Sequence, residues 1–127
     1  MSELTLRLYA ALNCEPMEDG YSHPAESILR AAKGEMVMEV RRLQPAGPSI
    51  FAGAIRCLGR IPEANGPAAA GLISDALKSE SAQVRDAAIC AAEQWGGGNM
   101  IAVLRNHHDP EPWLDDYRKG VITDLGG

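Results

Sequence analysis

The densest group of side chains that could do chemistry lies between residues 107 and 116. It combines two adjacent histidines with four carboxylates: His107, His108, Asp109, Glu111, Asp115 and Asp116. Imidazoles and carboxylates suit zinc or iron, so one hypothesis is a small metal-dependent enzyme at His107, His108 and Asp109. The group lacks the HExxH spacing, however, and adjacent histidines usually point apart. A solvated turn, followed by acidic residues that favour the dipole at a helix start, explains the same residues. We therefore predict no metal ligand set and no cofactor.

Candidate nucleophiles carry no recognisable catalytic pattern. The cysteines Cys14, Cys57 and Cys90 lie far apart and form no CxxC pair, which argues against a disulfide framework or a zinc site. Cys57 and Cys90 fall inside predicted helices beside alanines and leucines, where buried and unreactive thiols are expected. The GxSxG, P-loop and GxGxxG patterns are absent, and the GGGN run at 96–99 lacks the lysine of a phosphate cradle. We predict no enzymatic activity and no small-molecule substrate.

Composition narrows the classes of partner. The chain has 127 residues and a formal net charge of -5, which suits one folded domain. Nonspecific nucleic-acid binders and anionic-membrane binders need an excess of Lys and Arg, so neither partner is expected. No apolar run is long enough to cross a bilayer. Glu3 and Arg7 interrupt the first apolar stretch, and bulky Asn13 precedes Cys14, which argues against a lipoprotein signal. A cytoplasmic setting is expected.

The elements that must position these residues are predicted to be helices. Valine and threonine are scarce, and apolar residues recur every three or four positions rather than alternating. The expected helices cover residues 4–12, 24–43, 49–61, 68–78, 84–95, 99–106 and 113–125. In the second helix, Ser22 is the expected cap and Gly34 the expected bend. Asp109 or Glu111 is expected to cap the last helix, and residues 14–22 are expected to form an exposed acidic loop.

The inward faces of these helices repeat along the chain. Four positions recur at an offset of 30 residues, with Val84, Ala87, Ala91 and Trp95 followed by Leu114, Tyr117, Val121 and Leu125. Four recur at an offset of 34, with Leu43, Ile50, Ile55 and Ile61 followed by Leu77, Val84, Ile89 and Trp95. Such periodic helix pairs are typical of a helical solenoid, in which stacked neighbours bury the faces that one hairpin leaves open. We predict a single all-α domain, 1–127, with an N-terminal helix and loop (1–22) and three units (24–61, 66–96 and 99–126). A non-repeating bundle with chance matches is the alternative.

Residues 70–96, AGLISDALKSESAQVRDAAICAAEQWG, resemble a HEAT-like repeat of the lyase type. The resemblance rests on a Leu-rich first helix, a Ser/Glu turn and the run Val84-Arg85-Asp86-Ala87-Ala88. It implies that the valine and alanines face the core, while Arg85 and Asp86 cap and cross-link successive turns. The flanking units, 35–61 and 99–126, follow the pattern without the motif. The resemblance to HEAT repeats implies a concave binding surface and seldom catalysis.

The acidic surface gives the functional hypothesis. Carboxylates gather at Asp109, Glu111, Asp115, Asp116 and Asp124, and a second group comprises Glu15, Glu18 and Asp19. The helical phase buries Leu114 and leaves Trp113 partly exposed, as a partner anchor would be. The small acidic chain, with its WLxxY and DLG-like tail, is similar to immunity proteins of contact-dependent growth inhibition systems. We predict partner binding by Asp109, Glu111, Trp113, Asp115 and Asp116, with a basic toxin as partner. A scaffold or assembly adaptor and the small metal-dependent enzyme are the alternatives.

Overall fold

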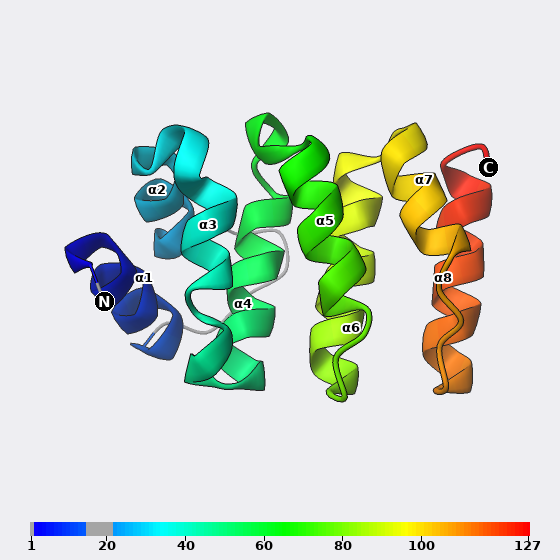
Figure 1. The fold of residues 1–127 in the computed structure, drawn as a ribbon, viewed down its shortest axis with the longest axis horizontal. Helices are drawn as coiled ribbons and strands as arrows, with labels where there is room; N and C mark the ends of the chain where they lie inside the picture. The colour runs from blue at the N-terminus through cyan, green and yellow to red at the C-terminus, as the bar shows by residue number, and fades with distance from the viewer. Residues whose placement is uncertain (1, 15–21) are drawn as a thin grey trace.

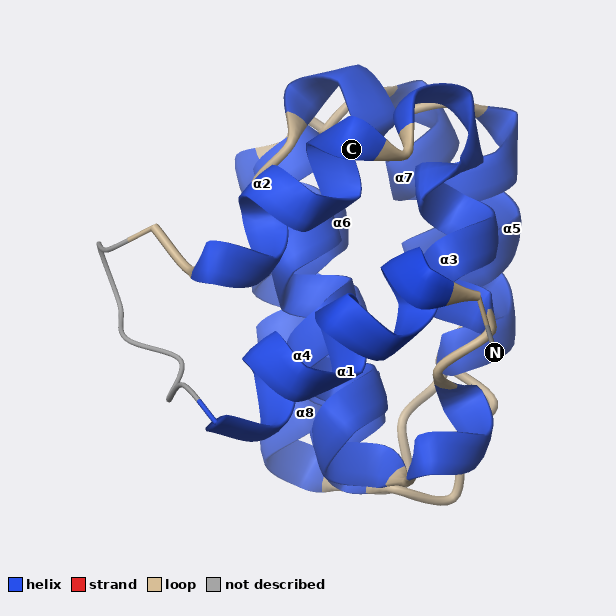
Figure 2. Cartoon of the chain, turned by 90° about the vertical axis from the view of Figure 1, so that its left-hand side faces the viewer, coloured by secondary structure: helices blue, strands red, loops and turns tan. Residues whose placement is uncertain are grey.

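The computed structural model describes residues 2–14 and 22–127 of the chain (Figure 1). In these two ranges every regular element is a helix and no strand occurs, which confirms the all-α prediction (Figure 2). The expected acidic loop, with Glu15, Glu18 and Asp19, lies almost wholly outside the described residues.

Eight α-helices run through the described residues. They are α1 (Glu3–Cys14), α2 (Pro24–Ala31), α3 (Met36–Arg41), α4 (Pro48–Gly59), α5 (Pro67–Ala76), α6 (Ala82–Trp95), α7 (Gly98–Arg105) and α8 (Pro112–Asp124). Three short 3-10 turns separate some of them: η1 (Lys33–Glu35), η2 (Gln44–Ala46) and η3 (Pro62–Ala64). Apart from the stretch 24–43, each expected helix agrees with an observed one to within two residues at either end.

Proline begins half of these helices. Pro24, Pro48, Pro67 and Pro112 are the first residues of α2, α4, α5 and α8. A proline at this position gives up an N–H that would have no partner in the helix, and its fixed φ suits the first turn. Ser81 caps α6, because its Oγ accepts from the backbone N–H of Val84 at 3.4 Å. These five helices therefore begin at residues whose types favour a helix start.

The cap of α2 is His23, one residue after the expected Ser22. The Ala25 N–H donates to His23 Nδ1 at 3.0 Å, and the His23 N–H donates to Glu26 Oε2 at 2.9 Å. This exchange is a capping box in which an imidazole replaces the usual hydroxyl. The prediction of Ser22 is wrong because Glu26 stands three residues after His23, the spacing that the reciprocal bonds require.

The single helix expected over 24–43 is two helices. The break falls at Lys33, whose φ of 53° is left-handed, rather than at Gly34. The turn η1 follows, and α3 begins at Met36. Because of this break, α2 and α3 both pack on α4 and also on each other. The apolar stripe expected from the sequence is therefore divided between two helices, α2 and α3, rather than lying on one.

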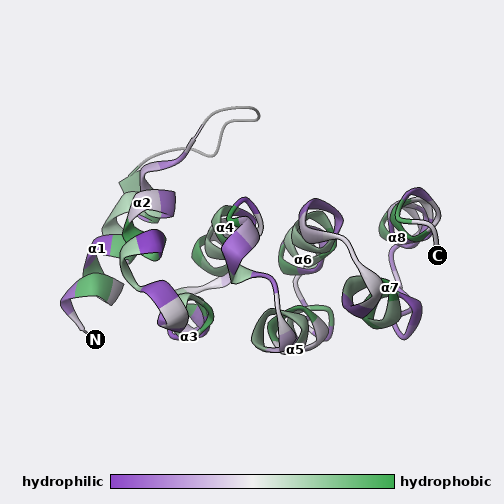
Figure 3. Ribbon diagram, turned by 90° about the horizontal axis from the view of Figure 1, so that it is seen from above, coloured by the Kyte–Doolittle hydropathy of each residue, from purple (hydrophilic) through white to green (hydrophobic). Residues whose placement is uncertain are grey.

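The helices lie in two rows (Figure 3). One row contains α4, α6 and α8, and the other contains α3, α5 and α7. From α5 on, each helix packs on the next helix along the chain and on the one after it, while α4 packs directly on α6. Helix α1 packs on α2 and α4 at the N-terminal end. The core thus runs between the rows from one end of the molecule to the other.

Several contacts join residues that are 30 to 34 positions apart in the sequence. The indole Nε1 of Trp95 donates to the carbonyl of Ile61, 34 residues earlier, at 3.0 Å. Ion pairs connect residues 33, 34 and 30 apart: Arg30 with Glu63, Arg41 with Asp75 and Arg56 with Asp86. Two of these ion pairs connect successive helices of one row (Figure 3), Arg41 of α3 with Asp75 of α5 and Arg56 of α4 with Asp86 of α6.

Candidate protein-binding site

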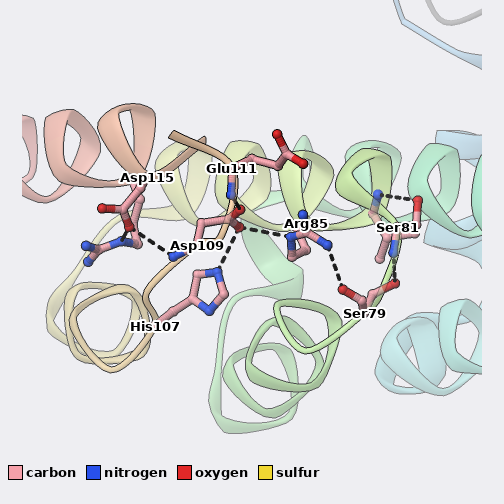
Figure 4. A network of polar contacts seen from close by, with 9 residues as sticks. Ser79, Ser81, Arg85, His107, Asp109, Glu111 and Asp115 are labelled. Atoms are coloured by element: carbon pink, nitrogen blue, oxygen red, sulfur yellow. Dashed lines mark hydrogen bonds and ion pairs between the residues drawn. The ribbon is translucent and has the colours of Figure 1, made fainter. Parts of the chain in front are cut away.

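The turn between α7 and α8 is organised around Asp109 (Figure 4). Its Oδ2 accepts from Arg85 Nε at 3.0 Å and lies 2.9 Å from His107 Nε2, while its Oδ1 accepts from the backbone N–H of Glu111 at 2.9 Å. The carboxylate is fully buried. Sequence analysis placed Asp109 on a partner surface, whereas the structure uses both of its oxygens to hold the turn.

Asp115, in the first turn of α8, closes the same network from the other side. Its Oδ1 accepts from the backbone N–H of Asp109 at 3.0 Å and from Arg118 Nε at 2.9 Å. Lys119 Nζ lies 3.3 Å from its Oδ2. Glu111 occupies the N-cap position of α8, but its side chain makes no capping bond. In place of the expected cap, the Asp109 side chain binds the backbone N–H of Glu111, and the Asp115 side chain binds the backbone N–H of Asp109. We call Asp109 and Asp115, with these bonds, the clamp.

The hydrogen bonds in this clamp favour ionised carboxylates. Burial alone would raise the pKa of Asp109, but bonds from His107, the Glu111 backbone and Arg85 outweigh it and lower the pKa below its ordinary value. The pKa of Asp115 is lowered chiefly by the backbone N–H of Asp109, with Arg118 and Lys119 adding to the effect. Both side chains are negative at neutral pH.

Two buried arginines tie this turn to the helix ends around it. Arg85 Nη1 donates to the carbonyl of Ser79 at 2.8 Å, and Arg118 Nη1 donates to the carbonyl of Leu104 at 2.9 Å. Carbonyls at the end of a helix have no partner within it, and a guanidinium can satisfy them while also binding a carboxylate. Arg85 thereby connects α6, the turn between α5 and α6, and the turn before α8. Sequence analysis missed Arg118, although its position three residues after Asp115 was a usable signal.

Arg85 and Asp86, adjacent residues of α6, form ion pairs with two different segments of the chain. Arg85 reaches forward to Asp109, and Asp86 Oδ2 accepts from Arg56 Nη2 of α4 at 2.8 Å. These two neighbours along the sequence therefore link α6 to α4 and to the turn before α8. They fix where the turn before α8 stands relative to the rest of the stack.

The five predicted partner-binding residues divide into an inner and an outer set. Asp109 and Asp115 belong to the clamp, whereas Glu111, Trp113 and Asp116 are exposed. Trp113 is 56% exposed and its neighbour Leu114 is fully buried, as the helical phase predicts. Trp113 and Asp116 are three residues apart and so share one face of α8. We call Glu111, Trp113 and Asp116 the outer surface.

Among the other candidates, the described residues form no metal site, and the thiols of Cys57 and Cys90 are poor nucleophiles. Among residues 2–14 and 22–127, no three side chains of His, Cys, Asp or Glu converge as metal ligands. His107 and Asp109 do meet, but the third group on that carboxylate is the cation Arg85. Burial raises the pKa of the Cys57 thiol to about 12, and it also raises the pKa of the Cys90 thiol. These thiols are protonated at neutral pH and so are poor nucleophiles.

The described residues thus form an all-helical protein with an exposed tryptophan, Trp113, at the start of α8. In the sequence, Trp113 lies between the exposed carboxylates Glu111 and Asp116. No helix of the described residues combines the length and the apolar character that crossing a membrane requires. Comparisons with protein-family models, curated proteins and solved structures give no match to the chain.

Proposed function

We propose that the chain is a non-catalytic protein-binding module, built as a short HEAT-like α-solenoid, that binds a basic protein partner through the outer surface. The observation that carries this proposal is Trp113, which is 56% exposed between the exposed carboxylates Glu111 and Asp116. The apolar surface of an indole is more favourably buried than exposed to water. Tryptophan is also enriched among the residues that dominate binding energy at interfaces.

The clamp beneath the outer surface supports the proposal energetically. Binding is weakened when a flexible segment must be ordered at the interface. Here Asp109 and Asp115 fix the start of α8 through Arg85 and Arg118, and both arginines are buried. Trp113 therefore stands on a backbone that is already braced, so less ordering is needed when the partner binds.

The negative charge of the chain indicates what kind of partner would bind the outer surface. The chain carries a formal net charge of -5, to which the two carboxylates of the outer surface, Glu111 and Asp116, contribute. Exposed charges of one sign accelerate association with a partner of the opposite sign, and salt screens the effect. A Lys- or Arg-rich surface with a pocket for one aromatic ring is the matching partner.

Within this class, the resemblance favours an immunity protein that acts in the cytoplasm by occluding a cognate toxin. A scaffold or adaptor is the second candidate, and a separate observation favours it. Leu6 on α1 and Met38 on α3 are 54% and 52% exposed. These helices lie at the other end of the molecule from α8 (Figure 1). Further exposed apolar side chains away from α8 suit a protein with two partners.

The experiment uses the purified product of the neighbouring reading frame as partner. Trp113→Ala is expected to weaken its binding at least about tenfold, as hot-spot truncations do. Gln94→Ala, at an exposed position of α6, is the matched control and should bind like the unaltered chain. Rescue of growth when the partner is expressed supports an immunity protein, and stable complex formation without rescue supports an adaptor. Equal binding by Trp113→Ala and Gln94→Ala would overturn the proposed surface.

A further inference from the structure

A hollow on the opposite half of the molecule from the outer surface has the chemistry of a small-molecule site. It has a volume of about 440 Å³ and is lined by Arg30, Lys33, Gly34, Met36, Ile61 and Glu63. The volume lies within the range of small-ligand sites. The residues come from the end of α2, the turn η1, the start of α3 and the turn η3.

The hollow has an apolar floor and a charged rim. Met36 and Ile61 lie at its base, where Met36 keeps 8% of its surface accessible and Ile61 is fully buried beneath it. Methionine adapts its shape to different apolar groups, which suits a ligand contact. Arg30 and Lys33 add two positive charges to the rim and Glu63 adds one negative charge. The rim therefore has a net charge of +1, which matches a ligand with one negative charge.

The cations at the rim keep donors for a ligand. Arg30 Nη1 lies 3.2 Å from Glu63 Oε2, a contact that uses one of the five N–H donors of the guanidinium. Within the described residues, Lys33 has no ion pair or side-chain hydrogen bond. Its ammonium has three donors on a flexible stem. A carboxylate in the hollow could therefore bind Lys33 without breaking the contact between Arg30 and Glu63.

The backbone at Lys33 supplies an independent argument. Lys33 has a φ of 53°, and it is the one residue other than glycine with a left-handed φ in the described part of the chain. Glycine adopts this conformation without steric cost, whereas a long side chain does not. Glycine stands at the next position, Gly34, where no left-handed φ is needed. Strained backbone of this kind is found at ligand sites, where the side chain is retained for its function.

We propose that this hollow binds a small organic monoanion, a carboxylate with an aliphatic or aromatic body, whose charge is held by Lys33 and Arg30 and whose body lies against Met36. This inference goes beyond the proposed function and does not depend on it, because the hollow shares no residue with the outer surface.

The test is calorimetric titration with three probes. Octanoate carries one negative charge and an apolar chain, octylamine carries the opposite charge on the same chain, and inorganic phosphate carries charge without a chain. Octanoate is expected to bind one site per chain with a dissociation constant below about 1 mM, while the other two bind at least about tenfold more weakly. Equal binding of octanoate and octylamine, binding of phosphate alone, or no saturable binding of octanoate would overturn the proposal.

Variants separate the site from general stability. Lys33→Gln is expected to weaken octanoate binding about tenfold, while Lys78→Gln, at an exposed lysine that lines a different hollow, leaves it unchanged. Lys33→Gly is expected to raise the midpoint of thermal unfolding, because glycine accepts the left-handed φ, and to weaken octanoate binding as much as Lys33→Gln does. Octanoate binding that is the same in Lys33→Gln, Lys33→Gly and Lys78→Gln would overturn the assignment of Lys33.

Discussion

Gly59 of α4 lies directly against the backbone of Ala91 of α6. A Cβ built on Gly59 would stand 2.7 Å from the Cα of Ala91 and 2.8 Å from its Cβ. Real side chains do not approach so closely, so the two helices are as near at this point as their backbones allow. The contact joins two successive members of the same row, and it depends on the absence of a side chain at Gly59.

Gly59→Ala is therefore expected to destabilise the fold by about 2 kcal/mol, because the added methyl forces α4 and α6 apart. The matched control is Gly120→Ala in α8, where the added Cβ would meet nothing within 4 Å. Alanine usually stabilises a helix interior relative to glycine, so this control should gain about 0.5–1 kcal/mol. Urea unfolding of the two variants measures the difference. Equal stability of both would show that the helices are not in backbone contact.

Asp109→Asn is expected to lower the free energy of unfolding by about 2 kcal/mol. The change leaves the buried guanidinium of Arg85 without its negative partner, and hydrogen bonds to charged groups are worth more than neutral ones. Asp116→Asn removes an exposed carboxylate from α8 and should change stability by less than about 0.5 kcal/mol. If the two variants unfold at the same urea concentration, Asp109 does not hold the turn.

Acid is expected to weaken the fold through the same clamp. The pKa values of Asp109 and Asp115 are lowered in the folded chain from an ordinary value of 3.8. Groups of this kind stabilise the fold above their unfolded pKa, and that stability is lost as the pH falls through the folded pKa. The midpoint of thermal unfolding should therefore fall between about pH 4 and pH 2. Asp115→Asn should show a smaller fall over this range, and an unchanged fall would contradict the role of Asp115.

The three cysteines are expected to react with a thiol reagent in a fixed order. Cys14 is exposed, Cys90 is partly buried and Cys57 is buried. Because burial raises the pKa of Cys57 to about 12, very little thiolate exists there near neutral pH. Absorbance titration at pH 8 should show one fast thiol, and Cys57 should react only after addition of urea. Fast labelling of Cys57 in the native chain, located by mass spectrometry, would show that it is accessible.

Local and periodic features were predictable from the sequence. Prolines and Ser81 mark several of the helix starts. Ile61 and Trp95, which the sequence pattern relates at an offset of 34 residues, are joined by a hydrogen bond. Such features depend on residue type and spacing, which sequence analysis reads directly. The exposure of Trp113 follows in the same way from the phase of α8.

The division of the acidic cluster was not predictable from local pattern. The sequence offers Asp109 as a cap but does not indicate that its carboxylate is buried against the guanidinium of Arg85, which lies 24 residues away along the chain. Likewise, the hollow joins Lys33 to Ile61 and Glu63, so it exists only once α2, α3 and η3 are packed. Contacts between distant segments decide both sites, and the helical period does not specify them.

The most direct test of the outer surface is the association rate constant of the Glu111→Gln, Asp116→Asn double variant with the neighbouring reading frame's product. At low salt the rate should fall about tenfold relative to the unaltered chain, and the two rates should converge as salt rises, since screening removes the same attraction. The midpoint of unfolding should stay unchanged because neither carboxylate belongs to the clamp. An association rate equal to that of the unaltered chain at low salt would contradict the account.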